Sequence, residues 1–390
     1  MFDALPPPVQ ALLDALAGAG HEAVLVGGCV RDRARGAPVH DFDVATSASP
    51  AALLALFPRA VPIGLRFGTV MVPTPAGPVD VTQYRGPSLE EDLARRDFTV
   101  NAIAWDPVRR AAFDPHGGLA DLAAGRLRAV GRAEERLAED PLRALRAARV
   151  AAELGLAVDP ALEAALPASA APLGRVAAER VRSELLRLLA GPRPLPGLAL
   201  LRRSGLEAAL VPNVREDALR VIDALPPDPT LRLAAWLRGT SAAGVLARWR
   251  VPRAQRLEVE TLLALHPVDE TAGADDAGAR RLRKRAGGAR QLERALALRE
   301  AECAAGSLPD PAAVRARLAA LRERLARTEA QAVVRAELAL TGADVMAYLG
   351  VGPGPQVGAA LRHLMERVLE DPAENTAARL RERLRVWAGR

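Results

Sequence analysis

Two carboxylates separated by one residue, Asp41 and Asp43, have the spacing of a pair that acts on a single target. In a β-strand, residues i and i+2 share a face, so both carboxylates would point the same way while Phe42 points into the core. Adjacent carboxylates repel each other unless a cation lies between them. Mg²⁺ held by one or two carboxylates and by substrate phosphates meets that need. The alternative is a solvated pair on a loop or a sheet edge.

A third carboxylate, Asp80, lies in an apolar run that alternates like a strand. If this strand lies beside Asp41 and Asp43, the three carboxylates share one site. Two metal ions about 3.5–4 Å apart could then clamp the attacking and leaving oxygens of a phosphoryl transfer. The alternative, an aspartate on an exposed strand face, stays open at this point.

A glycine pair, Gly27 and Gly28, separates the apolar run 24–26 from a segment, 30–35, that is predicted to form a short helix. Glycines between a strand and a helix let backbone N–H groups approach a phosphate closely. The positive end of the helix dipole favours the same ligand, and Arg31 in the first turn could reach a phosphate oxygen. Such a pair can also form an ordinary turn, but its position just before the acidic pair favours phosphate binding.

Four charged residues, Asp140, Arg143, Arg146 and Arg149, recur at every third position around the helix start expected at Pro141. With Asp140 as N-cap, steps of three drift about 60° each and form a slanting polar stripe. Asp140 could accept from the amine of cytosine or adenine while Arg143 donates to ring acceptors. Uracil and guanine would leave buried groups unpaired. The alternative is a capping aspartate followed by a solvated basic stripe.

Composition favours a soluble, basic, multidomain protein. The 390 residues are 50% hydrophobic but only 3% aromatic, which favours close-packed helices, and the net charge of +6 suits a polyanionic partner. Two cysteines, Cys29 and Cys303, predict neither a disulfide framework nor a zinc site. Without a signal segment or an apolar run of membrane-spanning length, we expect no membrane association and a cytoplasmic location.

Strand patterns are confined to the first ~120 residues. We predict helices at 9–19 and 49–57 and strands at 67–73 and 78–84. From Ala120 onward, leucines recur at helical spacing between glycines and prolines, which is typical of short helices. The polar segment 268–280 is predicted to be a linker or loop.

The glycine turn followed by the Asp41–Asp43 pair resembles the nucleotidyltransferase superfamily related to DNA polymerase β. Residues 95–102, Arg-Arg-Asp-Phe-Thr-Val-Asn-Ala, closely resemble a motif of the class II (bacterial-type) tRNA nucleotidyltransferases and poly(A) polymerases. This resemblance implies that Arg96 neutralises the triphosphate of the incoming nucleotide and that Asp97 and Asn101 bond its ribose hydroxyls.

The Asp140–Arg149 string resembles the amino-acid template of the same family, and the resemblance extends over about 24–215 and again over 340–375. It implies an α+β fold, with a polymerase-β-like head followed by an all-helical neck, body and tail. The expected domains are a catalytic head (1–138), a neck with the template (139–200), a body (201–275) and a tRNA-binding tail (276–390).

The resemblance implies Mg²⁺ as cofactor and the tRNA 3′ end and CTP as partners. The expected catalytic residues are Asp41, Asp43 and Asp80, with Asp41 and Asp43 as metal ligands. The residues expected to bind the nucleotide are Gly27, Gly28, Arg31, Arg96, Asp97, Asn101, Asp140, Arg143, Arg146 and Arg149.

One departure from the family concerns the connection between Arg85 and Ser88. Many members carry a long flexible loop here, associated with switching the pocket from cytosine to adenine, whereas only Gly86 and Pro87 intervene in this chain. Members without the loop are CC-adding enzymes that work with a separate A-adding partner. We therefore expect addition of CC from CTP, although loop shortening can be without consequence.

Other functions remain as alternatives to CC addition. The first is a complete CCA-adding enzyme that uses CTP and ATP, followed by an A-adding enzyme or a poly(A) polymerase. An inactive tRNA-binding protein is the alternative outside enzymes. The acidic pair argues against that last class, because a pure binding protein has no need for two carboxylates that repel each other.

Overall fold

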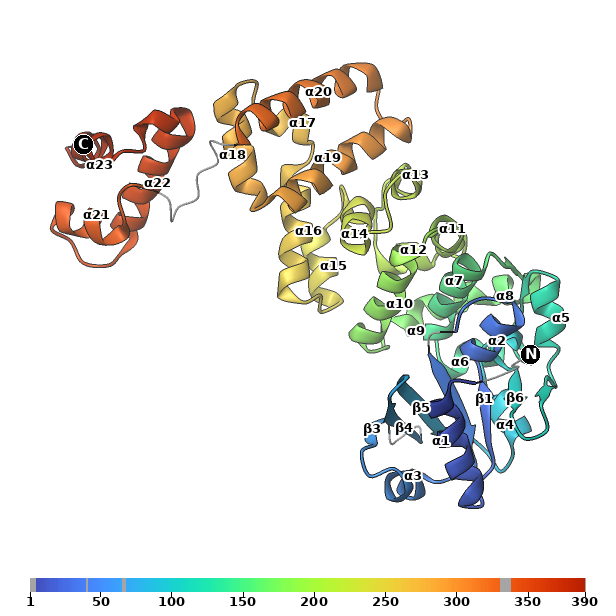
Figure 1. The fold of residues 1–390 in the computed structure, drawn as a ribbon. Coiled ribbons are helices and arrows are strands. Elements are labelled where there is room, and N and C mark those ends of the chain that lie inside the picture. Colours follow the sequence, from blue (N-terminus) through green and yellow to red (C-terminus); the bar gives the residue numbers. More distant parts are fainter. Residues whose placement is uncertain (1–4, 40, 65–67, 330–337, 390) are drawn as a thin grey trace. The chain divides into compact units, whose positions relative to one another are not determined.

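The computed structural model describes residues 5–39, 41–64, 68–329 and 338–389, and the chain forms two compact units, Met1–Leu210 and Val211–Arg390 (Figure 1). Phe67, the first residue of the predicted strand 67–73, lies outside the described residues. The finer division into head, neck, body and tail stays a prediction. Each unit is treated by itself below.

A mixed sheet forms the centre of the first unit, with strand order β3-β4-β5-β2-β1-β6-β7 among the described residues. Its strands are β1 (Ala23–Val26), β2 (Phe42–Thr46), β3 (Val61–Gly64), β4 (Thr69–Thr74), β5 (Gly77–Gln83), β6 (Ala104–Asp106) and β7 (Ala111–Phe113). Only β2 and β5 run parallel, in a register that sets Asp43 beside Asp80. The sheet confirms the predicted α+β class, while β3, β6 and β7 were not predicted.

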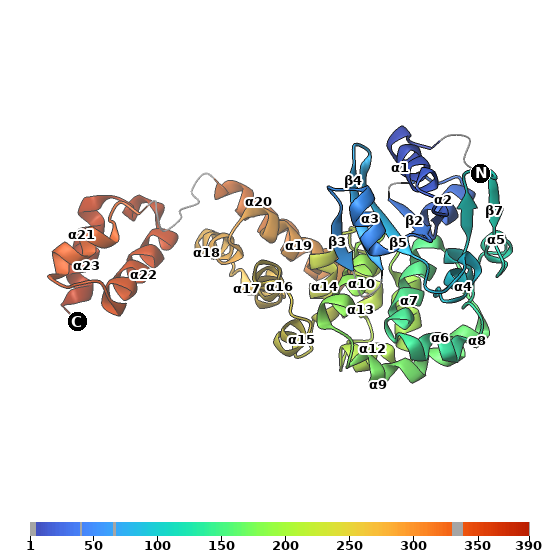
Figure 2. The same cartoon turned by 90° about the horizontal axis from the view of Figure 1, so that it is seen from below.

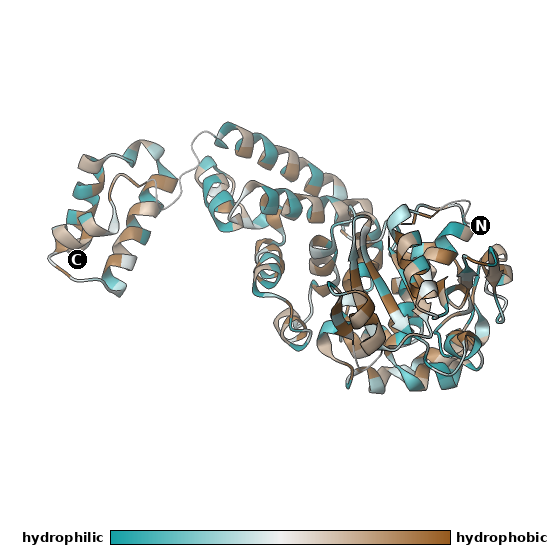
Figure 3. Ribbon diagram, turned by 60° about the horizontal axis from the view of Figure 1, so that its bottom comes forward, coloured by the Kyte–Doolittle hydropathy of each residue, from teal (hydrophilic) through white to brown (hydrophobic). Residues whose placement is uncertain are grey.

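Alternation along the central strands separates an apolar core from the predicted acidic site. Val44 and Val81 are fully buried on the face covered by α1 (Pro7–Gly18), α2 (Gly28–Ala34) and α3 (Pro50–Leu56) (Figure 2). Asp43 and Asp80 point to the opposite face because side chains alternate along a strand. Figure 3 shows apolar residues concentrated along these strands.

The opposite face of the sheet is partly covered by α4 (Leu89–Ala94), whose Leu93 packs on Val24, Tyr84 and Ala104. Ser88 caps this helix by accepting from the backbone of Glu91. This bond is the Ser88 half of a capping box. The helix therefore begins directly after the short Gly86–Pro87 connection.

The rest of the first unit is helical apart from two short strands. Its elements are α5 (Gly118–Ala123), β8 (Arg126–Leu127), α6 (Ala133–Glu139), α7 (Leu142–Leu154), β9 (Ala157–Val158), α8 (Pro160–Ala165), α9 (Ala170–Leu173), α10 (Ala178–Ala190), α11 (Leu195–Arg203) and α12 (Leu206–Leu210). Helix α7 packs against α10 and α11. The approach to α11 requires Gly197, where a Cβ would lie 2.4 Å from the carbonyl oxygen of Ala148.

The described part of the second unit is entirely helical. Its helices are α13 (Ala218–Asp223), α14 (Pro229–Leu237), α15 (Ala242–Arg248), α16 (Arg253–Leu265), α17 (Val268–Thr271), α18 (Asp276–Ala286), α19 (Ala289–Ala304), α20 (Pro311–Arg327), α21 (Gly342–Leu349), α22 (Pro355–Glu370) and α23 (Ala377–Ala388). The last three helices share a core of their own. Among the described residues, none of the helices is both long and apolar enough to cross a membrane.

The linker or loop predicted at 268–280 is wrong for most of the segment, because α17 and the start of α18 occupy it and only residues 272–275 form a loop. Its polar composition has a structural cause. The carboxylate of Asp269 is fully buried and accepts hydrogen bonds from Arg299 and Arg317. A residue type typical of loops is therefore stabilised inside a helical bundle by two guanidinium groups.

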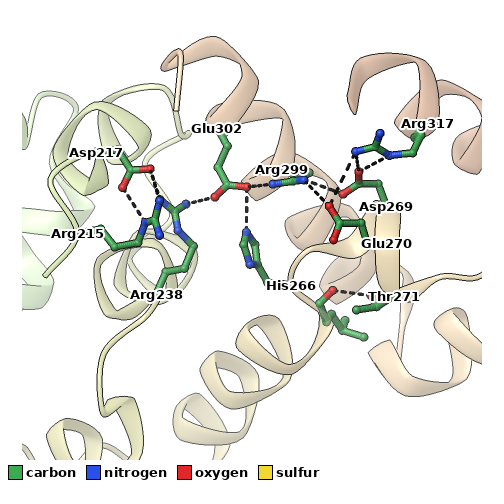
Figure 4. A network of polar contacts seen from close by, with 11 residues as sticks. Arg215, Asp217, Arg238, His266, Asp269, Glu270, Thr271, Arg299, Glu302 and Arg317 are labelled. Carbon is green, nitrogen blue, oxygen red and sulfur yellow. Dashed lines mark hydrogen bonds and ion pairs between the residues drawn. The ribbon is translucent and has the colours of Figure 1, made fainter. Parts of the chain in front are cut away.

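A network of alternating charges, buried at its centre and exposed at its ends, joins several of these helical segments (Figure 4). Arg238 contacts Asp217 at 2.9 Å and Glu302 at 2.6 Å, and Glu302 in turn accepts from Arg299, which also bonds Asp269. The network also includes Arg215, His266, Glu270 and Arg317. Burial opposes ionisation of Glu302, but the bonds from His266 and Arg299 and the charge of Arg238 outweigh it and lower its pKa. Glu302 is thus the shared anion of the network.

We predict that Glu302→Gln destabilises the protein by about 3 kcal/mol, since it leaves two buried arginines short of negative charge. The folded pKa of Glu302 lies below its ordinary value of 4.5. Its contribution is therefore complete above pH 4.5 and is lost as the pH falls through the lower folded pKa. Denaturant unfolding of wild type and variant between pH 7 and pH 3 measures the effect.

The matched control is Glu300→Gln, two residues away on the same helix, where an exposed ion pair joins Glu300 to Arg322. Exposed pairs contribute little, so this variant should unfold like the wild type. Equal stability of the two variants would contradict the role assigned to Glu302.

Candidate active site

A cavity of about 690 Å³ in the first unit brings together every residue that the sequence predicted for the site. These residues are Gly27, Gly28, Arg31, Asp41, Asp43, Asp80, Arg96, Asp97, Asn101, Asp140, Arg143, Arg146 and Arg149. They come from separate motifs of the sequence, and the first and last of them, Gly27 and Arg149, are more than 120 positions apart. Their catalytic and binding roles stay predictions, but their common location follows from the fold.

The predicted carboxylates lie at the meeting point of β2 and β5. Asp43 lies beside Asp80 in the parallel register, and Asp41 directly precedes β2. Burial raises the pKa of Asp43 to about 6; the charge of Arg96 opposes this rise, and Asp80 and Asp41 add to it. Burial and the charge of Asp41 also raise the pKa of Asp80. The charged forms of Asp43 and Asp80 are thus destabilised by burial first and by neighbouring carboxylates second.

A divalent cation bound between the carboxylates would stabilise their charged forms, because its positive charge offsets their repulsion. Within the described residues, however, no three His, Cys, Asp or Glu side chains form a group able to hold a metal ion by themselves. Two carboxylates, Asp41 and Asp43, could hold such an ion together with substrate phosphates. Such partial protein coordination is typical of Mg²⁺.

The glycine turn between β1 and α2 lies beside the acidic pair. Gly27 adopts φ 73°, and a Cβ at this position would lie only 3.0 Å from Nη1 of Arg96. Conformation and space therefore both require glycine. Between this turn and the core, the Cys29 thiol donates to the carbonyl of Val26, and burial raises its pKa to about 11. A neutral, buried thiol has no chemical role here.

A chain of polar contacts runs across the cavity wall from α2 to α7. Arg31 donates to the side-chain oxygen of Asn101 at 2.7 Å, and Asn101 donates to Asp97 at 3.1 Å. The other carboxylate oxygen of Asp97 lies 2.8 Å from Nη2 of Arg146. Burial opposes ionisation of Asp97, but the charge of Arg146 and the bond from Asn101 outweigh it and lower its pKa. Residues predicted from three motifs thus position one another.

Arg96 is held by a carboxylate that the sequence analysis did not select. Its Nε and Nη2 donate to one oxygen of Asp92, and its Nη1 donates to the carbonyl of Asn101. The other oxygen of Asp92 accepts from Arg85, at the end of β5. Arg85 also lines the cavity.

The predicted base-selecting pair lies where α6 ends and α7 begins. Helix α7 begins at Leu142 rather than at Pro141, and Asp140 accepts from the backbone N–H of Leu142. The other oxygen of Asp140 lies 2.6 Å from Arg180. Arg143 donates to Glu139 and to the backbone carbonyls of Arg136 and Arg95. These three bonds leave two of the five guanidinium N–H donors of Arg143 for a ligand.

Arg149, the last member of the predicted stripe, forms ion pairs with two carboxylates. It contacts Glu184 at 2.6 Å and Glu153 at 2.7 Å, which joins α7 to α10. Burial opposes its charge, but these two carboxylates outweigh burial and raise its pKa. Arg149 thus lines the cavity and at the same time joins two helices, and its predicted role in nucleotide binding stays a prediction.

Three residues that line the cavity, Arg85, Arg180 and Arg187, were not predicted from the sequence. Asp92, which bonds Arg85 but does not line the cavity, was also not predicted. Arg180 and Arg187 are seven residues apart on α10, so they share a helix face with each other. That spacing was a usable signal. Asp92 offered none, because a carboxylate between two glutamates and an arginine pair is typical of a solvated charged segment.

Family models match two parts of the chain. Residues 23–128 match the poly(A) polymerase head domain, and residues 155–217 match a domain described as "Probable RNA and SrmB- binding site of polymerase A". The first match covers the sheet with its carboxylates, and the second begins just after α7.

Whole-length relatives extend this likeness to both units. The chain is 34% identical to a CCA-adding enzyme of Geobacillus stearothermophilus over 98% of its own length and 97% of that protein. It is 44% identical to a CC-adding tRNA nucleotidyltransferase of Shouchella clausii over 49% of its length and 50% of that protein. A crystal structure of the Bacillus stearothermophilus CCA-adding enzyme in complex with CTP aligns with a TM-score of 0.76 at 33% identity, covering 98% of both chains. The chain therefore belongs to the class II family of tRNA nucleotidyltransferases and poly(A) polymerases.

Proposed function

We propose that this tRNA nucleotidyltransferase adds two CMP residues from CTP to the 3′ end of a tRNA that lacks its CCA terminus, and then stops. The observation that carries the proposal is the attachment of the Arg143 side chain to α4, which begins immediately after the two-residue Gly86–Pro87 connection. We further propose that a separate enzyme adds the final A, that the helical tail binds tRNA, and that the protein works in the cytoplasm.

The reaction joins the tRNA 3′ oxygen to the α-phosphorus of CTP and breaks the bond between the α-phosphorus and the bridging oxygen, so that pyrophosphate leaves. Asp41 and Asp43 would hold Mg²⁺, with Asp80 beside them. A bound Mg²⁺ supplies positive charge to the phosphoryl oxygens and the leaving group. The carboxylates themselves orient the reacting groups at the edge of β2 and β5.

The glycine turn and two arginines would hold the triphosphate. Gly27 and Gly28 line the cavity without side chains, and Arg31 and Arg96, whose guanidinium groups lie against these glycines, bring positive charge to the same wall. Asp97 and Asn101 lie together in the next part of the wall, where they would bond the ribose hydroxyls.

Asp140 and Arg143 would recognise the base. The contacts with Leu142 and Arg180 use one acceptor site on each carboxylate oxygen of Asp140, so further acceptor sites remain for the amine of the base. Arg143 retains donors for the ring acceptors of cytosine. Arg146, which lies against Asp97, would connect base and ribose recognition. Uracil would place an N–H donor toward Arg143 and a carbonyl toward Asp140, so neither would be satisfied.

The stop after CC follows from how the template helix is fastened. Arg143 donates to the carbonyl of Arg95 at 2.8 Å, and Arg136 donates to that of Ala94 at 3.0 Å, so both hold the C-terminal end of α4. The other end of α4 is joined to β5 through Gly86 and Pro87, and Pro87 restricts the backbone further. Movement of Arg143 toward a purine setting would have to move α4 as well.

A complete CCA-adding activity with CTP and ATP is the second candidate. It is favoured by the whole-length relatives, which are named CCA-adding enzymes, whereas the CC-adding relative matches about half of the chain. Adenine also presents an amine beside a ring acceptor, so the Asp140–Arg143 pair alone does not reject it. The two candidates differ only in whether the pocket reaches the purine setting.

We predict that Asp41→Ala or Asp43→Ala lowers nucleotide incorporation about a thousandfold, the loss expected when several kcal/mol of charge stabilisation disappear. Binding of tRNA should be nearly unchanged in a gel-retardation assay, because the pair acts on the reacting phosphates. Normal incorporation by both variants would remove them from the catalytic role.

We predict that Asp140→Ala reduces the preference for CTP over UTP by about 10- to 100-fold, since bidentate base contacts contribute ~1–3 kcal/mol of discrimination. The matched control is Asp159→Ala. Asp159 accepts from the backbone N–H two residues later at the start of α8, as Asp140 does at the start of α7, but it does not line the cavity. A CTP preference that is unchanged in both variants would leave Asp140 with a capping role alone.

We predict that the purified protein extends a tRNA lacking CCA by two cytidines and extends a tRNA ending in CC poorly with ATP and Mg²⁺. A long family loop grafted between Arg85 and Ser88 should produce A addition, because it releases one end of α4. The same graft between Thr74 and Gly77, in the β4–β5 turn, is the control. Efficient completion to CCA by the unmodified protein would favour the second candidate.

A further inference from the structure

The Asp92 side chain, only 2% exposed, is shared between two arginines with different surroundings. One oxygen accepts from the backbone N–H of Arg85 at 3.2 Å and from its Nε at 2.8 Å. The other accepts from Nε of Arg96 at 3.3 Å and from its Nη2 at 3.2 Å. One buried carboxylate thus connects the residue before the short connection to a residue of the cavity wall.

Arg96 has little freedom at this position. Its guanidinium is fixed on one edge by Asp92 and at Nη1 by the carbonyl of Asn101, and it lies against the backbone at Gly27. Charge from Arg96 reaches Asp43, where it opposes the rise in pKa. The orientation of Arg96 toward the site therefore depends on the carboxylate behind it.

Arg85 closes the other side of this arrangement. Its Nη2 also donates to the backbone carbonyl of Asp92, so the two residues are joined by three donors of Arg85 across the Gly86–Pro87 connection. Arg85 is 38% exposed, whereas Arg96 is 17% exposed. The Gly86–Pro87 connection is therefore held against α4 by the partly exposed side chain of Arg85.

The charges of this group remain suited to an anion. Burial opposes ionisation of Asp92, but the bond from Arg85 and the charges of Arg96 and Arg85 outweigh it and lower its pKa. Two guanidinium groups and one carboxylate leave one net positive charge beside the cavity. Asp92 can thus hold Arg96 in place without cancelling its attraction for a phosphate.

We propose that Asp92 is a positioning residue for the triphosphate of the incoming nucleotide, and that Arg85 acts on this triphosphate through Asp92 and Arg96 rather than by direct contact. The proposal rests on the phosphate-binding role proposed above for Arg96. It assigns a function in nucleotide binding to the two residues that flank the short connection. Loosening the Arg85–Asp92 contact should let Arg96 leave its orientation.

The first test is Arg85→Met, which removes the guanidinium from a partly exposed position and keeps the apolar stem. The KM for CTP and the inhibition constant of inorganic pyrophosphate should both rise about tenfold, as expected when a charged hydrogen bond that fixes Arg96 is lost. The KM for tRNA and the preference for CTP over UTP should stay unchanged. If Arg85 had a structural role alone, Arg85→Met would lower the stability of the protein but would not weaken pyrophosphate binding while the KM for tRNA stays unchanged.

The matched control is Arg126→Met. Asp121 is a second buried aspartate of the same unit that is clamped by two arginines, Arg126 and Arg128, and Arg126 is 48% exposed. None of these three residues lines the cavity. Arg126→Met should therefore leave the KM for CTP and the pyrophosphate constant as in the wild type. An equal rise in both variants would overturn the proposal, because general loosening of the unit would explain it.

A double-mutant cycle separates action through Arg96 from direct contact, which Arg85 could make because it also lines the cavity. In an Arg96→Met background, Arg85→Met should have no further effect on either constant. Additive effects would overturn the proposal and assign Arg85 to direct binding. Arg85→Lys should recover part of the loss, and Asp92→Asn should reproduce the Arg85→Met result if the variant folds.

Equilibrium binding of CTP and pyrophosphate keeps this test independent of the proposed CC specificity. These constants refer to the first nucleotide and do not depend on whether the enzyme stops after CC or completes CCA. If Arg96→Met alone leaves CTP binding unchanged, the proposed role of Arg96 fails and the inference fails with it. If Arg96→Met weakens CTP binding and Arg85→Met does not, the inference alone fails.

Discussion

Repulsion between carboxylates is the constraint around which the first unit is organised. The parallel register of β2 and β5 sets Asp43 beside Asp80, with Asp41 directly before the strand, and burial raises the pKa values of Asp43 and Asp80. A protein that keeps such an arrangement needs nearby positive charge. The glycine turn lets Arg96 approach to where a side chain at Gly27 would lie. The apolar face of the same strands anchors the acidic edge in the core.

Arginine performs two different tasks in this chain, which contains a single lysine. In the second unit, the planar guanidinium groups of Arg238 and Arg299 alternate with carboxylates and leave a network whose charges are balanced. In the cavity, arginines exceed their carboxylate partners around Asp92, so positive charge remains for a ligand. The difference between a structural and a binding arginine therefore lies in the local balance of charge rather than in residue type.

Sequence reasoning located the chemical motifs well, because each motif carries its residues at short, regular spacing. Asp43 on a strand, the turn at Gly27 and the Asp140 string all reached one cavity. It failed where the decisive contact is long-range. Asp269 lies in a segment that resembles a loop until its arginine partners are known, and no spacing in the sequence indicates that Arg149 pairs with Glu184, 35 residues away. The short strands β3, β6 and β7 carry too few residues for a pattern.

The base selection proposed for Asp140 and Arg143 would depend on backbone groups that no sequence motif displays. Arg143 belongs to the recognised template string, yet its position is set in part by the carbonyl of Arg95 at the end of α4. At its other end, α4 is fastened through Asp92 to Arg85. The two-residue Gly86–Pro87 connection, the six-residue helix α4 and Arg143 are thus joined by consecutive contacts. The same side chains on a longer connection could move independently of β5, so under the proposed function the specificity of the pocket would depend on this linkage as well as on the residues proposed to face the base.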